Sequence, residues 1–240
     1  WNFADDIYFG GNSLGDYKKF KTGTYDENWY QSWGASYKGI RQASIFIENI
    51  DMNTKFTEEE RADLKAQARF VRAYYYWLLL RRYGPVPLLP DEGLDYTSSY
   101  DDLAVQRNSY DECVEYICQM MDLAAYDLPM HYWDDQTRLG RPNKLVCLAV
   151  KAIVRNLAAS PQFNGNTEYA NFKNHDGTPL INTTYSEQKW KDAAAAAKAV
   201  IDMAEKYPDT RLKLYRNDEN GDTEFNPYKS CVDVQLKAWN

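Results

Sequence analysis

Apolar residues recur at helical spacing along most of the chain. In the segment WYQSWGASYKGIRQASIFIENI they return every three or four residues, which puts them on one face of an amphipathic helix. The positions on this face are Trp33, Tyr37, Ile40, Ser44 and Ile47. The pattern predicts a first helix over residues 27–51.

A second helix is predicted between a capping signal and a glycine. Thr57 is followed three residues later by Glu60, which is the spacing of a capping box. The helical pattern continues to Tyr83 and stops at Gly84. Residues 70–80 are apolar on nearly every side, so we expect this helix to lie buried between neighbours.

Three more helices follow. Ser109 with Glu112 repeats the capping box, Asn143 caps the run KLVCLAVKAIVRNLAAS, and Ser186 opens the run SEQKWKDAAAAAKAVIDMAEKY. The prolines that end these helices are Pro129, Pro161 and Pro208. Strand signals are few, and an Asp-Gly turn in HDGTPLI predicts one short hairpin. The sequence therefore predicts an all-α protein.

The fifth helix carries small residues between large ones. Trp190, Ala193, Ala197 and Ile201 share one predicted face, as in tetratricopeptide helices that pack closely on a neighbour. We expect antiparallel helix pairs of tetratricopeptide-like type with long irregular loops, and an ordinary alanine-rich bundle is the alternative. The side chains predicted to share the core are Phe70, Tyr74, Trp77, Leu148, Ile153 and Trp190.

Composition and charge exclude several classes of partner. The chain has 240 residues, 44% of them hydrophobic, which suits a single domain. Its formal net charge of -7 opposes binding to nucleic acid or to an anionic membrane. The longest apolar run, residues 74–80, is too short to span a bilayer. No leader sequence precedes Trp1, so we expect a mature or cut product.

The four cysteines lack the spacing of a metal site. Cys113 and Cys118 are five residues apart, so on a helix they point about 140° away from each other. Neither His131 nor His175 lies near a cysteine in the sequence. We expect four free, partly buried thiols, and neither a metal ion nor another cofactor.

Other site chemistries find no support in the sequence. The run RNDENGD is similar to a calcium loop, but Arg216 and Pro227 stand where acidic ligands are needed. We expect a solvated turn there. The sequence shows no Gly-rich phosphate loop and no nucleophile motif, so no residue is predicted to be catalytic.

Five blocks of sequence resemble the SusD/RagB family, in the order expected for it. The most specific is QARFVRAYYYWLLLRRYGPVPLLP, which is similar to the family signature EARFLRAYYYFxLVxxYGxVPL and has Gln67 where the family usually has Glu. The block before it is matched by Trp33, Tyr37, Ile40 and Asn49. The later blocks are RNSYDECVEYICQMMDLAAYDLP, GRPNKLVCLAVKAIVRNLAASPQFNGN and KWKDAAAAAKAVIDMA, and the five span residues 29–205.

The resemblance implies a surface glycan-binding protein and not an enzyme. SusD/RagB proteins are outer-membrane lipoproteins of Bacteroidetes-type bacteria that pass oligosaccharide or polysaccharide to a TonB-dependent porin of the SusC type. The family's lipidated cysteine and C-terminal half find no match here. We therefore expect residues 1–240 to be a single SusD-like helical domain, a fragment that lacks both and whose lipid anchor lies outside it.

Aromatic side chains beside polar ones are the candidates for sugar contact. Aromatic residues make up 15% of the chain, and the C–H face of a sugar stacks on such rings while its hydroxyls seek polar partners. The first candidate is the loop MHYWDDQTRLGR, and the second is the N-terminal run WNFADDIYFGGN. The predicted ligand-binding residues are Trp133, Tyr132, His131, Asp134, Trp1 and Tyr8.

Each candidate has an alternative explanation. Trp133 can fill the gap between the third and fourth helices, and the N-terminal run can be a frayed end. Two other functions also stay open. An α-helical glycoside hydrolase or lyase would use a carboxylate pair that cannot be singled out among so many acidic residues. A peptide-binding helical-repeat scaffold would line a concave groove with Asn and Lys.

Overall fold

The chain is all-α, as predicted. The computed structural model describes residues 19, 22–26, 31–91, 97, 99, 101, 104–132, 135–207 and 213–236. These residues form six α-helices and no β-strand: α2 (Trp33–Asn49), α3 (Glu58–Tyr83), α5 (Tyr110–Asp127), α6 (Lys144–Ala159), α7 (Glu187–Lys206) and α8 (Pro227–Leu236). The 3-10 helices among them are η2 (Ile50–Met52), η3 (Gln136–Arg138), η4 (Thr167–Asn171) and η6 (Asn217–Asn220).

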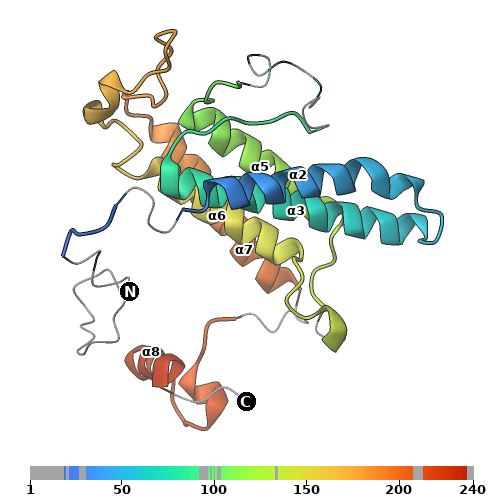
Figure 1. Cartoon of the computed structure of the whole chain (residues 1–240). Coiled ribbons are helices and arrows are strands. Elements are labelled where there is room, and N and C mark those ends of the chain that lie inside the picture. Colours follow the sequence, from blue (N-terminus) through green and yellow to red (C-terminus); the bar gives the residue numbers. More distant parts are fainter. Residues whose placement is uncertain are drawn as a thin grey trace.

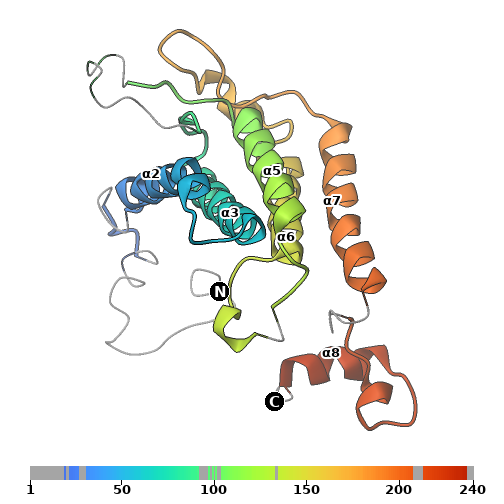
Figure 2. The same ribbon diagram turned by 90° about the vertical axis from the view of Figure 1, so that its right-hand side faces the viewer.

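Helices that are neighbours in the sequence are neighbours in space. α2 packs on α3, α3 on α5, α5 on α6 and α6 on α7, and α3 also touches α6. Figures 1 and 2 show this stack, in which successive helices run antiparallel. The predicted antiparallel pairs of tetratricopeptide-like type are therefore confirmed, with α3 at the centre against three other helices.

Side-chain caps set the helix starts as predicted. The Oγ1 atom of Thr57 accepts a hydrogen bond from the backbone N–H of Glu60 at 3.2 Å, and the Glu60 carboxylate accepts one from the Thr57 N–H at 2.8 Å. Ser109 and Glu112 form the same reciprocal pair ahead of α5. At the end of α3, Gly84 has a φ of 71°, a conformation that favours glycine.

The first helix is shorter than predicted. The sequence pattern indicates residues 27–51, whereas α2 spans Trp33–Asn49 and continues as η2. Residues 27–30 lie outside the described part of the chain. Ile40 and Ser44, two positions of the predicted apolar face, are buried, so that face is confirmed.

The crossing of α2 and α3 depends on a glycine. A β-carbon on Gly39 would lie 2.4 Å from the ring of Tyr75, so the two helices approach closely only because position 39 has no side chain. Beside this contact, the ring of Tyr37 packs edge-on against Tyr76 at 6.3 Å, and its hydroxyl donates to the carbonyl oxygen of Pro87 at 2.7 Å. The polar end of a half-buried ring is thereby satisfied.

The predicted core is correct only in part. Trp77 is 4% exposed, as expected, and Phe70 and Leu148 are half-buried. The prediction is wrong for Tyr74, Ile153 and Trp190, whose exposed fractions are 37%, 55% and 41%. Apolar spacing identifies a face of a helix, but the packing of the stack decides which faces other helices cover.

The orientation of α7 shows this effect. The helix packs on α6 through Ala193 and Ala196, which are both buried. Ala197 and Ile201, which the sequence placed on the packing face, are exposed. The buried face is thus displaced around the helix axis from the predicted one.

The predicted hairpin is a minimal one. An antiparallel bridge joins Lys173 and Pro179, and the N–H of Asn174 donates to the carbonyl oxygen of Thr178 at 3.0 Å. Gly177, with a φ of 87°, makes the turn.

All four cysteines are free, as predicted, but they differ in burial. Cys113, Cys118 and Cys147 lie in the core, whereas Cys231 is exposed, which corrects the expectation that all are partly buried. Burial raises the pKa of Cys113 and of Cys118 to about 11 and that of Cys147 to about 12. The three core thiols are therefore inert side chains that fill space.

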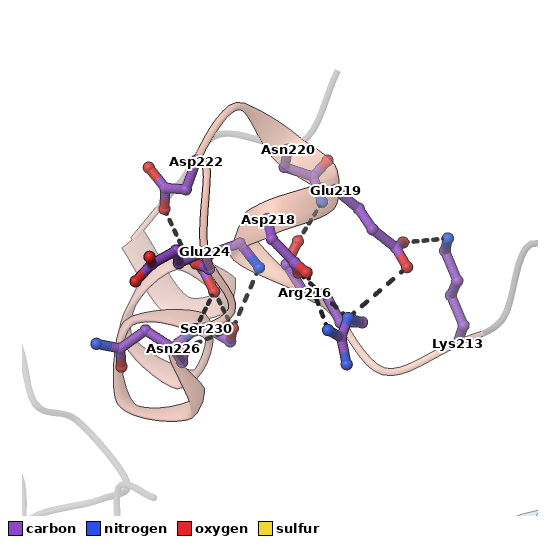
Figure 3. Close-up of polar contacts among 10 residues, drawn as sticks. Lys213, Arg216, Asp218, Glu219, Asn220, Asp222, Glu224, Asn226 and Ser230 are labelled. Atoms are coloured by element: carbon purple, nitrogen blue, oxygen red, sulfur yellow. Dashed lines mark hydrogen bonds and ion pairs between the residues drawn. The ribbon is translucent and has the colours of Figure 1, made fainter.

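The segment that contains η6 and α8 folds around a buried asparagine. The amide nitrogen of Asn217 donates to Asp222 at 2.7 Å, and its amide oxygen accepts from the Asn226 N–H at 2.8 Å and from the Ser230 hydroxyl at 3.0 Å. Figure 3 shows three of these partners, Asp222, Asn226 and Ser230, around the turn and the start of α8. The expected solvated turn is exposed at Glu219, Asn220 and Gly221, but Asn217 is buried. Among the described elements, η6 and α8 contact each other and no helix of the stack.

Candidate functional site

The loop between α5 and α6 is pinned to α3 by one aspartate. The hydroxyl of Tyr132 donates to Oδ1 of Asp63 at 3.0 Å, and the guanidinium of Arg138 forms an ion pair with Oδ2 of the same carboxylate. The Arg138 guanidinium also lies over the ring of Tyr132, 4.3 Å from its centroid. Asp63 thus holds both ends of the segment that carries the predicted sugar contacts.

Tyr132 is an anchor in this arrangement. Its side chain is 7% exposed, and burial together with the Asp63 carboxylate raises the pKa of its hydroxyl to about 12. The phenol therefore stays protonated and remains a donor to Asp63 at physiological pH. A third donor, Nε2 of Gln67, reaches Oδ2 of Asp63 at 3.0 Å, so the carboxylate is well satisfied although it is largely removed from water.

The other predicted ligand-binding residues are only partly placed. His131 is half-buried next to Tyr132. The remaining four, Trp133, Asp134, Trp1 and Tyr8, lie outside the described residues. Further along the loop, Asp135 caps η3 by accepting the N–H of Thr137 at 2.9 Å. The structure therefore brings Tyr132 together with Asp63 and Arg138. The sequence analysis missed Asp63, because no motif links it to Tyr132, which is 69 residues away in the sequence.

A groove lies between α2, α3 and α5. Its volume is about 310 Å³, and its apolar wall is made by Ile47 and Met120. The charged side chains that line it are Glu48, Asp51, Lys65, Arg69, Arg72 and Asp91. No sequence pattern indicates this groove, because it is formed by three separate helices and the segment after α3.

Arg72 forms the base of the groove and fixes its walls. Its guanidinium donates to Oγ of Ser44 at 2.9 Å and to the carbonyl oxygens of Leu89 and Pro90 at 2.8 and 3.0 Å, and it forms an ion pair with Asp91. The hydroxyl of Tyr116 donates to the same Asp91 carboxylate at 2.9 Å. A fully buried arginine therefore joins α2, α3, α5 and the exit segment of α3.

Neither feature shows the arrangement of a catalytic or metal centre. Two of the groove carboxylates are paired with cations, Asp51 with Lys65 and Asp91 with Arg72. Across the described residues, no group of three or more His, Cys, Asp or Glu side chains is placed to hold a metal ion. The contacts in both features position the α5–α6 loop and the walls of the groove.

No helix in the described part of the chain is long and apolar enough to cross a membrane.

Proteins of known sequence and structure are similar to this chain. A SusD-like protein of Bacteroides ovatus is 27% identical over 166 residues, which are 68% of this chain and 28% of the relative. The solved structure of BT4246 superposes with a TM-score of 0.74 at 29% identity, over 85% of this chain and 34% of that protein. The surface glycan-binding protein A of Bacteroides uniformis shares the fold, with a TM-score of 0.59 at 20% identity over 89% of this chain and 41% of its own.

The family assignment rests on a match to a family model. The chain spans about a third of the length of the Bacteroides ovatus protein and of BT4246. A family model of SusD-like proteins, described as "Starch-binding associating with outer membrane", matches residues 10–155, which is more than half of the chain. The chain therefore belongs to the SusD-like family.

Proposed function

We propose that this protein captures oligosaccharide or polysaccharide at the surface of the outer membrane, for import through a TonB-dependent porin of the SusC type. The match of residues 10–155 to a family described as starch-binding and associated with the outer membrane carries this proposal. The similarity to BT4246 over most of the chain supports it. The acidic net charge of -7 also suits a neutral partner better than a polyanion.

Within this function, the α5–α6 loop is the proposed ligand contact. Tyr132 is anchored on Asp63, and its neighbours in the sequence, His131, Trp133 and Asp134, are proposed to contact the sugar. Trp1 and Tyr8 of the N-terminal run are proposed to add further ring contacts. A shallow patch of this kind suits a hydrated oligosaccharide, which loses many water hydrogen bonds on entering a deep pocket.

The protein is proposed to bind glycans without cleaving them. The ion pairs of Asp51 with Lys65 and of Asp91 with Arg72 leave these carboxylates poorly suited to act as an acid and a base. A polysaccharide panel assayed for reducing sugar tests the alternative of a glycoside hydrolase or lyase. Release of reducing sugar by the purified protein would contradict the proposal.

The chain is further proposed to be the helical portion of a longer SusD-like protein. Its relatives are about three times as long as the part that it matches. In this proposal a lipid anchor outside residues 1–240 attaches the protein to the membrane. Co-purification of a TonB-dependent porin with the native protein from solubilised outer membranes tests the partnership, and recovery of the native protein without a porin would contradict it.

The Trp133→Ala variant tests the ligand loop directly. If Trp133 stacks on sugar, its loss should weaken binding by about 1–3 kcal/mol, as expected for a central aromatic contact. The melting temperature should stay nearly unchanged, because a loop side chain at the ligand surface adds little to folding. Calorimetric titration with glycans and a melting curve on the same variant provide the two measurements.

A core tryptophan would behave in the opposite way. Its replacement by alanine would lower the free energy of unfolding by about 3–5 kcal/mol and leave the affinity of the folded fraction intact. That outcome would show that Trp133 fills the gap between α5 and α6 and is not a ligand contact. Tyr126→Ala is the matched control, because this ring on α5 is 84% exposed and takes part in no proposed contact.

A further inference from the structure

The groove between α2, α3 and α5 contains two charged side chains that make no hydrogen bond to the described residues. Within the described residues, the exposed carboxylate of Glu48 has no hydrogen bond or ion pair. Among the described residues, the guanidinium of Arg69 forms an ion pair with Asp127 at 3.7 Å, which is longer than a hydrogen bond, and its N–H groups have no hydrogen-bond partner. The groove therefore offers one acceptor and one forked donor to a ligand.

The rest of the groove is rigid and already satisfied. Lys65 is paired with Asp51, and Arg72 holds Asp91 and two backbone carbonyl oxygens at the base. Because Arg72 is fully buried, the walls on α2 and α3 are set before any ligand arrives. A preformed site loses little conformational entropy on binding.

The charges of the groove indicate an uncharged ligand. Its lining carries three carboxylates and three cations, so it has no net charge to attract an anion or a cation. A sugar hydroxyl both donates and accepts, so neighbouring hydroxyls can donate to Glu48 and accept from Arg69. Ile47 and Met120 offer an apolar wall to the C–H face of the ring, and the volume of about 310 Å³ is at the lower end for small-molecule sites.

We propose that this groove is a second saccharide-binding site, which takes a neutral sugar unit between Glu48 and Arg69. The site is separate from the Trp133 loop, and the proposal rests on the glycan-binding function proposed above. The two open groups would bind hydroxyls that a glycan presents beyond the units held at the loop.

Two single substitutions test the groove in the complete chain. Glu48→Gln removes the charge of the acceptor, and Arg69→Met removes the donor while keeping an unbranched side chain. Each should weaken the binding of neutral oligosaccharides of glucose, xylose or mannose by about tenfold to a hundredfold, the effect of losing a hydrogen bond to a charged group. Glu205→Gln removes the same charge from the exposed end of α7 and should leave affinity unchanged.

The outcomes separate this proposal from the one on which it rests. If the wild-type protein binds neutral oligosaccharides and both groove variants bind them equally well, the second site is wrong and the glycan-binding function stands. If the wild-type protein binds none of these sugars but binds uronate-containing ones, the neutral class is wrong. If it binds no saccharide at all, both proposals fail. Melting curves of both variants show whether a loss of affinity comes from unfolding. If unfolding explains the whole loss of affinity in both variants, the proposed second site is wrong.

Discussion

Arg72 has a structural role in the segment that most closely resembles the family signature. Arg72 stands in the run ARFVRAYYY, and its guanidinium is buried among two tyrosine rings, each 5.5 Å from it. Its donors hold the carbonyl oxygens of Leu89 and Pro90. The prolines after α3 are stiff, and the arginine fixes the direction in which they leave the helix. Arg72 therefore fixes the exit of the chain from α3.

Replacing Arg72 by lysine should be severely destabilising for this reason. A lysine keeps the charge but lacks the planar fork, so at least one buried carbonyl oxygen loses its donor. The expected loss in free energy of unfolding is about 2–4 kcal/mol, measured by urea denaturation. Arg41→Lys is the control, because position 41 on α2 is exposed and should tolerate the change. Equal stability of the two variants would contradict the role of Arg72 in holding the carbonyl oxygens of Leu89 and Pro90.

At the scale of single helices, the capping boxes determine where α3 and α5 begin. Hydrogen bonds from the Ser109 hydroxyl and from its backbone N–H lower the pKa of the Glu112 carboxyl. A group whose pKa is depressed in the folded state stabilises the protein above its unfolded-state pKa, and this stability is lost as the pH falls through the folded-state pKa. The helix dipole acts in the same direction.

Glu112→Gln should therefore show a pH-dependent cost. At neutral pH the variant should lose about 0.3–1 kcal/mol, because the amide lacks the negative charge that favours a helix start. As the pH falls below the range in which glutamate ionises, the wild-type carboxyl is protonated too, and the difference should vanish. Urea denaturation of both proteins across this range measures it. A difference that stays constant with pH would show that the charge has no role.

The close crossing of α2 and α3 gives a second prediction at this scale. Gly39→Ala should destabilise the protein by about 1–3 kcal/mol, because the new methyl group collides with the Tyr75 ring and the helices must separate. Gly34→Ala lies on the same helix with nothing within 4 Å, so it should stabilise α2 by up to about 1 kcal/mol. Opposite signs in thermal denaturation are expected, and a stabilising Gly39→Ala would mean that Tyr75 simply moves aside.

For the whole molecule, the stack of helices brings together parts of the chain that are far apart in sequence. Asp63 on α3 reaches Tyr132 and Arg138 in the loop between α5 and α6, at separations of 69 and 75 residues. The predicted ligand loop thus has its base on the central helix of the stack. The position of this loop therefore depends on how α3 and α5 pack against each other.

Asp63→Ala should release this loop without unfolding the stack. Tyr132 and Arg138 would lose their shared acceptor, so backbone amides of residues 135–141 should exchange hydrogen faster while those of α6 stay protected. Hydrogen exchange followed by mass spectrometry measures both. Asp122→Ala is the control, because it removes an ion pair to Lys151 between α5 and α6 and leaves the loop contacts in place. Unchanged exchange of the loop in Asp63→Ala would contradict the anchor.

The sequence by itself determined five of the six helices in the described part of the chain, all except α8, and it pointed to the family. The starts of α3 and α5 follow from Thr57 and Ser109, because a cap acts over three residues and needs no tertiary contact. Apolar spacing and the ordered blocks led to an all-α, SusD-like chain, which the fold and the family match confirm.

Only the tertiary structure decided which faces are covered and which side chains meet. Trp190 has the spacing of a core residue, yet it is exposed, because α7 turns Ala193 and Ala196 towards α6. The meeting of Asp63 with Tyr132 could not be predicted either. Contacts of this kind depend on the angles and distances at which helices pack, and many distant residues together set those values.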